Sequence, residues 1–73
     1  MEDRIIEILK DVLDVQEVDI NSSQDTLDNW NSLRHLNLIS EFEDEFDLEF
    51  DPEEIAEMKS VKKIVEIIRA KQG

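Results

Sequence analysis

Apolar residues recur at intervals of three and four in three separate segments of this chain, and this spacing constrains the fold more than any other feature. Such intervals place apolar side chains on one face of an α-helix, whereas a half-buried strand would show strict alternation of apolar and polar residues. No segment has the pattern of a strand. The sequence therefore predicts an all-α fold.

The first helix is expected over residues 2–14, with Glu2 and Asp3 at the end where negative charge favours the helix dipole. Residues 15–31 are rich in Asn, Asp and Ser, which favour turns. A connection of about 17 residues is long for a compact domain, and long connections are usually functional or disordered. Single apolar anchors favour an ordered, functional loop; they are Val18, Ile20, Leu27 and Trp30.

The second helix is expected over residues 32–47, with Asn31 or Ser32 able to cap its first turn. A short third helix should begin after Asp51, where Pro52 and Glu54 stand at first-turn and capping-box positions, and it should end near Glu57.

Ser60 is expected to cap a last helix whose apolar positions begin at Val61 and whose final turn carries Arg69 and Lys71. The prediction is one domain over residues 1–73. It is a small four-helix bundle with three longer helices, one short third helix and a long first loop.

The second helix has two faces of different character. At about 100° per residue, one arc gathers the side chains expected in the core: Leu38, Ile39, Phe42 and Phe46. The other face combines two leucines with polar and acidic side chains next to a serine at the helix start. An acidic face is ordinarily just solvated, but this combination is typical of a docking surface. Its candidate partner-binding residues are Leu33, Leu36, Asn37, Ser40, Glu41, Asp44 and Asp47.

The charge balance limits the partners. Eight Lys and Arg stand against 20 Asp and Glu, which gives a net charge of −12. Binding nucleic acid or an anionic membrane needs clustered basic residues, so basic protein surfaces are the expected partners. No run approaches the roughly 18 apolar residues of a membrane span, and the N-terminus lacks the features of a signal peptide. We expect a cytoplasmic monomer without stable membrane insertion.

The composition also argues against most enzymes. The one glycine, Gly73, excludes glycine-rich phosphate loops, and without cysteine or a second histidine beside His35 the sequence predicts no metal site of the usual kinds. A calcium loop starting at Asp47 fails, because Pro52 stands where glycine belongs and Met58 where a bidentate glutamate belongs. So small a core is also expected to offer no preformed substrate cleft of ordinary size.

Several segments together resemble the acyl carrier proteins over nearly the whole chain. They are Asn31-Ser32-Leu33, Leu38-Ile39, Glu43 to Phe46, Asp51 to Met58 and Ser60-Val61. The family motif is Asp-Ser-Leu, and a separate transferase esterifies its serine to 4′-phosphopantetheine. Acyl groups then travel as thioesters on the thiol of that arm. By this resemblance Ser32 is the attachment residue, and the protein is a non-catalytic carrier.

The resemblance also implies partners and a binding region for the cargo. The partners would be a phosphopantetheinyl transferase and acyl-transferring or acyl-modifying enzymes with basic docking patches, in fatty-acid, polyketide or related lipid biosynthesis. Acyl chains of the family can fold back among the helices. The residues that would line such a pocket are all ordinary core candidates as well: Ile39, Phe42, Phe46, Ile55, Met58, Val61 and Ile64.

The chain departs from the family pattern around the attachment motif. Asn31 replaces the aspartate, Asn29 and Trp30 replace small residues, and Arg34 stands where acids are frequent, as does Asn37. These departures predict a specialised carrier. Arg34 is interpreted either as a contact to the phosphate of the arm or to a partner, or as an unpaired surface residue.

Other interpretations stay open at this point. His35 is expected to be a partly covered structural histidine, and Trp30 an anchor of the loop. An aminoacyl or peptidyl carrier is the nearest alternative, although those carriers tend to be less acidic. An unmodified acidic adaptor would use Ser32 only as a helix cap. Hydrolysis by Ser32 and His35 is a further alternative, for which no oxyanion hole is visible.

Overall fold

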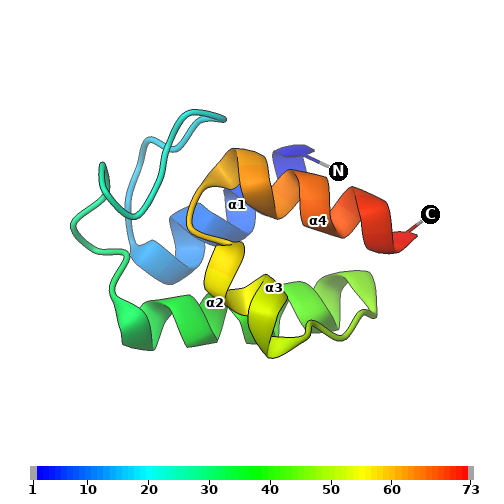
Figure 1. Ribbon diagram of the computed structural model, residues 1–73. Coiled ribbons are helices and arrows are strands. Elements are labelled where there is room, and N and C mark those ends of the chain that lie inside the picture. Colours follow the sequence, from blue (N-terminus) through cyan, green and yellow to red (C-terminus); the bar gives the residue numbers. More distant parts are fainter. Residues whose placement is uncertain (1, 73) are drawn as a thin grey trace.

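The computed structural model describes residues 2–72, which form four helices. They are α1 (Glu2–Leu13), α2 (Ser32–Phe46), α3 (Pro52–Glu57) and α4 (Val61–Gln72). Helix α1 packs against both α2 and α4, and the short α3 lies across the space between α2 and α4 (Figure 1). Within residues 2–72 there is no strand, only an isolated bridge between Ser23 and Ser60. The predicted all-α bundle with a short third helix is confirmed.

Each long helix buries one apolar stripe in a shared core. Helix α2 contributes Leu38, Ile39 and Phe42, as the predicted arc requires. Phe46, the fourth residue of that arc, is only partly buried. It lies in the last turn of α2, at the edge of the bundle, with its ring 6.4 Å from that of Phe42. The stripes of α1 and α4 comprise Ile5, Ile8, Leu9, Leu13, Val61, Ile64, Val65 and Ile68.

The first two helices each end one residue before the predicted position, at Leu13 and Phe46. The next residues, Asp14 and Asp47, both have φ of 54°, which is the left-handed region. Left-handed residues end an α-helix, and only glycine adopts this conformation without steric cost. Because the chain has no internal glycine, aspartate takes this place at both ends.

The long first connection is ordered, as predicted. Val18 and Trp30 are buried in the core, and Leu27 packs against it. The prediction that Ile20 also anchors the loop is wrong, because this side chain is exposed. The Asp19 side chain accepts the backbone N–H of Asn21 at 2.8 Å, and Ile20, in the middle of this turn, stays in contact with solvent.

Hydrogen bonds tie the first loop to two different parts of the bundle. The Asn29 side chain donates to the carbonyl of Leu13 at 3.0 Å, at the end of α1. In the middle of the loop, the backbone N–H of Gln24 donates to the carbonyl of Lys59 at 2.9 Å. The loop therefore spans from α1 to the junction of α3 and α4, and it fixes the point at which α2 begins.

The last two helices start as the sequence predicts. The Asp51 N–H donates to the Glu54 carboxylate at 2.8 Å, which is the capping-box contact at the start of α3. The Ser60 hydroxyl accepts the N–H of Lys63 at 3.1 Å at the start of α4. These caps fix where each helix begins, so α3 sits at a defined position beside α2.

Candidate functional site

Ser32 is the first residue of α2, and its side chain is exposed. The N-cap is Asn31, whose side-chain oxygen accepts the N–H of Arg34 at 2.9 Å. Of the two caps that the sequence allowed, Asn31 is therefore the one used. The interpretation of Ser32 as a plain helix cap is wrong, and its hydroxyl has no hydrogen-bond partner within residues 2–72.

The start of α2 leaves backbone donors near this hydroxyl. The N–H of His35 donates to the Asn31 carbonyl at 2.8 Å, and the N–H of Arg34 is taken by the Asn31 side chain. The N–H groups of Ser32 and Leu33 have no partner in the described part of the chain. Free N–H groups at the positive end of a helix dipole favour negative charge on Ser32.

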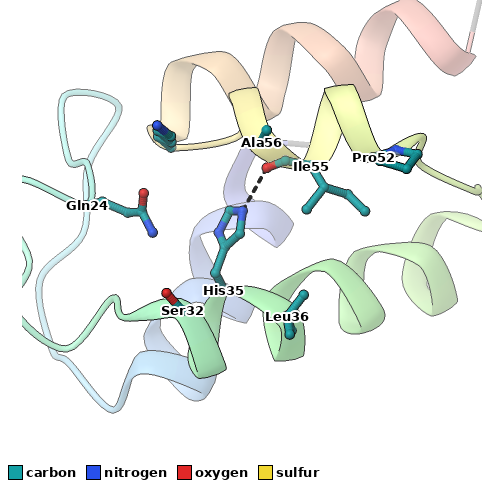
Figure 2. A pocket seen from close by; sticks show the side chains of 8 residues that line it. Gln24, Ser32, His35, Leu36, Pro52, Ile55 and Ala56 are labelled. Atoms are coloured by element: carbon teal, nitrogen blue, oxygen red, sulfur yellow. Dashed lines mark hydrogen bonds between the residues drawn. The ribbon is translucent and has the colours of Figure 1, made fainter.

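Ser32 lines an open cleft of about 490 Å³ between the first loop, α2 and α3. In Figure 2, His35 and Leu36 rise from α2 toward Ile55 and Ala56 of α3, while Gln24 extends in from the loop. The expectation that the chain has no cleft of ordinary size is wrong, since clefts of 300–1,000 Å³ are typical of ligand sites. The cleft lies between elements at the surface and does not need a large core.

His35 forms the inner wall of the cleft. Its Nδ1 accepts a hydrogen bond from the indole Nε1–H of Trp30 at 3.0 Å. Because Nδ1 is an acceptor, the proton sits on Nε2, which donates to the carbonyl of Ile55 at 2.8 Å. The predicted structural roles of His35 and Trp30 are confirmed: both are buried. With both ring nitrogens engaged, His35 cannot act as a base for Ser32, which argues against hydrolysis.

Arg34 points away from the cleft. Its guanidinium donates to the carbonyl of Val12 at 3.2 Å, in the last turn of α1. Arg34 is half-buried and forms no ion pair with an acid among residues 2–72, but its guanidinium is engaged on the side of α1. A contact of Arg34 to the phosphate of the arm or to a partner stays a prediction. Arginine has five donors in a fixed fork, and here it satisfies a carbonyl that the end of a helix leaves free.

The predicted docking residues all lie exposed on one side of α2, and we call them the acidic face of α2. Leu33 and Leu36 are 71% and 60% exposed and lie on the same side of the helix as the acids. In the described part of the chain, none of the three carboxylates of this face takes part in an ion pair. The other members of the face are Asn37, Ser40, Glu41, Asp44 and Asp47.

Two neighbouring acids of α2 have structural roles instead. The Glu43 carboxylate accepts the backbone N–H of Phe50 at 3.0 Å and so holds the loop before α3. Glu45 pairs with Arg4 of α1 at 2.9 Å, and the hydrogen bond from that guanidinium holds the pKa of Glu45 below its ordinary value. Among the acids of α2 and its C-cap, those without such a role are therefore the three of the acidic face of α2.

The residues proposed to line an acyl pocket are divided between the cleft and the core. Ile55 lines the cleft. The ordinary-core interpretation is confirmed for five others, which are buried, and Phe46 packs partly buried against them. The buried five are Ile39, Phe42, Met58, Val61 and Ile64.

Sequence reasoning missed four of the residues that line the cleft: Gln24, Pro52, Ala56 and Lys59. Each lies in a loop or on the exposed side of a short helix, where apolar periodicity carries no information. Only the contact between the first loop and the start of α4 brings Gln24 and Lys59 together.

Two further findings concern residues 2–72 as a whole. No helix in residues 2–72 combines the length and apolar character needed to cross a membrane. The same residues contain no group of three or more His, Cys, Asp or Glu side chains arranged to hold a metal ion.

Comparison with known proteins identifies the family. No curated protein matches the chain. The family model described as "Phosphopantetheine attachment site" matches residues 3–68, which is nearly the whole chain. The resemblance inferred from the sequence is thereby confirmed. The chain belongs to the phosphopantetheine-binding family of carrier domains, which are not enzymes themselves but hold a 4′-phosphopantetheine group that a phosphopantetheinyl transferase attaches.

Proposed function

We propose that Ser32 is the residue that holds the phosphopantetheine arm and that the protein is an acyl carrier. The observation that carries this proposal is the state of the Ser32 side chain. It is exposed at the first position of α2 and lines an open cleft. Its hydroxyl is not used as the helix cap, because Asn31 caps α2 instead. A hydroxyl to be esterified must be free and accessible in this way.

The residues around Ser32 fit a phosphodiester. The free N–H groups of Ser32 and Leu33 and the positive end of the α2 dipole favour the negative charge that esterification brings. When attached, the arm supplies a thiol on which cargo is carried as a thioester. The chain itself provides the attachment oxygen, the cleft beside it and the surface that partners recognise.

The cargo is proposed to be an acyl group of fatty-acid, polyketide or related lipid biosynthesis, since the net charge of −12 fits an acyl carrier better than an aminoacyl or peptidyl carrier. Partner enzymes would bind the acidic face of α2 through basic patches, with apolar contacts at Leu33 and Leu36. The departures around Ser32, Trp30 and Asn31 above all, support a specialised carrier. A monomer working in the cytoplasm completes the proposal.

The test is the intact mass of the protein after incubation with coenzyme A and a broad-specificity phosphopantetheinyl transferase. We expect the parent chain to gain the mass of one phosphopantetheinyl group and Ser32→Ala to gain none. Ser40→Ala is the matched control for which serine is esterified, because Ser40 is also exposed on α2. Since Ser40 belongs to the proposed docking surface, only the final mass gain is compared and not its rate, and that gain is expected to be unchanged.

Loading of Ser32→Ala would overturn the assignment of Ser32. An unmodified parent chain after treatment with several transferases would count against the carrier proposal and would favour the adaptor. The nature of the cargo is tested next, by offering the loaded protein to ligases for fatty acids and for amino acids. A clear preference for amino acids would contradict the acyl assignment.

A further inference from the structure

Most positive charges of the protein are already engaged. Arg4, Lys63, Arg69 and Lys71 form ion pairs, and Arg34 binds the Val12 carbonyl. Among residues 2–72 this leaves three of the eight basic side chains without a partner: Lys10, Lys59 and Lys62. Only Lys59 lines the cleft that holds Ser32.

The main chain around Lys59 is firmly placed. The Lys59 carbonyl accepts the N–H of Gln24 at 2.9 Å, and its own N–H donates to the Glu57 carbonyl at 2.8 Å. The preceding residue, Met58, is fully buried in the core. The exposed ammonium group therefore extends from a fixed point between α3 and α4, on the wall of the cleft that the first loop adjoins.

The rest of the cleft wall has two kinds of surface. Beside Ser32 and Lys59 it is polar, through Gln24. Toward α3 it is largely apolar, through Leu36, Pro52, Ile55 and Ala56. A ligand that carries one anionic group next to Ser32 and methyl or methylene groups beyond it would match this arrangement.

An attached arm has one such anion, the phosphodiester bonded to the Ser32 oxygen. A lysine ammonium binds phosphate as a compact point charge with three donors. In a protein with a net charge of −12, an unpaired lysine that lines the same cleft as the attachment residue is a specific feature. Arg34, which is nearer to Ser32 in the sequence, is already bound to α1.

We propose that Lys59 is the phosphate-binding residue of the cleft, and that its ammonium pairs with the phosphodiester on Ser32 and holds the first part of the arm along the cleft. This inference rests on the proposed attachment at Ser32. Lys59 is a positioning residue, because it orients the arm and takes no part in the chemistry at the thiol.

The test compares loaded proteins by ³¹P NMR spectroscopy, with Lys59→Gln as the variant. Lys62→Gln is the matched control, since Lys62 is an exposed, unpaired lysine three residues away that does not line the cleft. In the parent protein we expect the ³¹P resonance to differ from that of the same protein unfolded in urea, and to move toward it in 0.5 M NaCl, because salt screens exposed ion pairs.

In Lys59→Gln the ³¹P resonance should already lie near the unfolded position and respond little to salt, whereas Lys62→Gln should behave like the parent. Lys59→Arg should restore most of the parent's shift. As a second measurement, amide resonances of Gln24 and Ile55 should move on loading of the parent and not of Lys59→Gln. Circular dichroism confirms that each variant is folded.

Identical ³¹P positions and salt responses for Lys59→Gln and Lys62→Gln would overturn the role of Lys59. That outcome differs from failure of the proposed function, which would appear earlier as the absence of a mass gain on Ser32. A parent resonance that coincides with the unfolded one would likewise overturn the inference, because the phosphodiester would then be free in solvent.

Discussion

The indole N–H of Trp30 donates to Nδ1 of His35 over 3.0 Å, and both side chains are buried. The other ring nitrogen of His35 reaches the Ile55 carbonyl in α3 at 2.8 Å. One imidazole thus joins the first loop, α2 and α3 directly behind the cleft. Buried polar groups satisfied in this way specify a single packing arrangement, because any other arrangement leaves a donor or acceptor unpaired.

Replacing this imidazole should be costly. His35→Leu leaves the buried Trp30 N–H without a partner, and it removes one of two hydrogen bonds to the Ile55 carbonyl, which keeps the N–H of Met58 at 3.3 Å. An unsatisfied buried donor costs about 1–3 kcal/mol. We expect the free energy of unfolding, measured in urea, to fall by that amount, with a change in Trp30 fluorescence. Asn37→Ala, an exposed change on the same helix, should stay within about 0.5 kcal/mol of the parent. A His35→Leu protein as stable as this control would contradict the role of the network.

The cap of α2 can be tested separately from Ser32. Asn31→Ala removes the bond to the Arg34 N–H and should lower the free energy of unfolding by about 1 kcal/mol. Asn31→Asp should keep the bond and add a favourable charge at the helix start, so it should be at least as stable as the parent at neutral pH. Ser32→Ala should change stability little in the same urea titration, because Ser32 is not the cap.

The contact between α3 and α4 predicts a dependence on pH. Glu54 of α3 forms an ion pair with Lys71 of α4 at 2.9 Å. The hydrogen bond from the Asp51 N–H, and after it the hydrogen bond from Lys71, lower the pKa of the Glu54 carboxyl below its ordinary value of 4.5. A carboxyl whose folded pKa is lowered stabilises the fold above its unfolded pKa, and this contribution is lost as the pH falls through the folded value. Glu54→Gln should therefore be less stable than the parent at pH 7, and the difference should shrink below about pH 4.5.

Thermal unfolding between pH 7 and pH 3 checks this prediction. Glu53→Gln is the control for the general effect of removing an acid, because Glu53 is exposed and has no ion pair within residues 2–72. The two variants should differ from each other at pH 7 and converge at pH 3. Parallel curves across the whole range would show that the Glu54 contacts do not contribute.

Charge on the acidic face of α2 should control the rate of encounter with partners. Asp44→Lys is expected to lower the second-order rate of phosphopantetheinylation several-fold at low salt, and the loss should diminish in 0.5 M NaCl. Asp11→Lys changes the net charge equally from α1 and should have a much smaller effect. Equal effects of the two variants would mean that only the net charge matters and would remove the support for a docking surface on α2.

Most of the fold could be predicted from the sequence, because the apolar spacing and the capping residues that determine a helix lie within one short segment. Apolar spacing located the three longer helices, the capping signal at Asp51 located the short third helix, and Ser60 marked the start of the last one. The errors have local causes as well. Ile20 was misplaced because an Asx turn, and not hydrophobicity, decides where it points. The helix ends were one residue off because aspartate adopts the left-handed conformation there.

The candidate site was less accessible to prediction. Ser32 and the acidic face of α2 could be found because they share one helix, where periodicity is informative. The cleft could not, because Gln24 and Lys59 meet only through a backbone hydrogen bond across 35 positions of the chain. The binding of Arg34 to Val12 was hidden for the same reason, since it depends on how α1 ends beside α2.

Asp47 illustrates a conflict between stability and recognition. A left-handed aspartate is strained by about 1 kcal/mol relative to glycine, and its negative charge lies at the helix end where the dipole disfavours it. Asp47→Gly would relieve both effects, yet it would remove a carboxylate from the proposed docking surface. The same strain at Asp14, outside that surface, offers a site where glycine could make the protein more robust without weakening its recognition by partners.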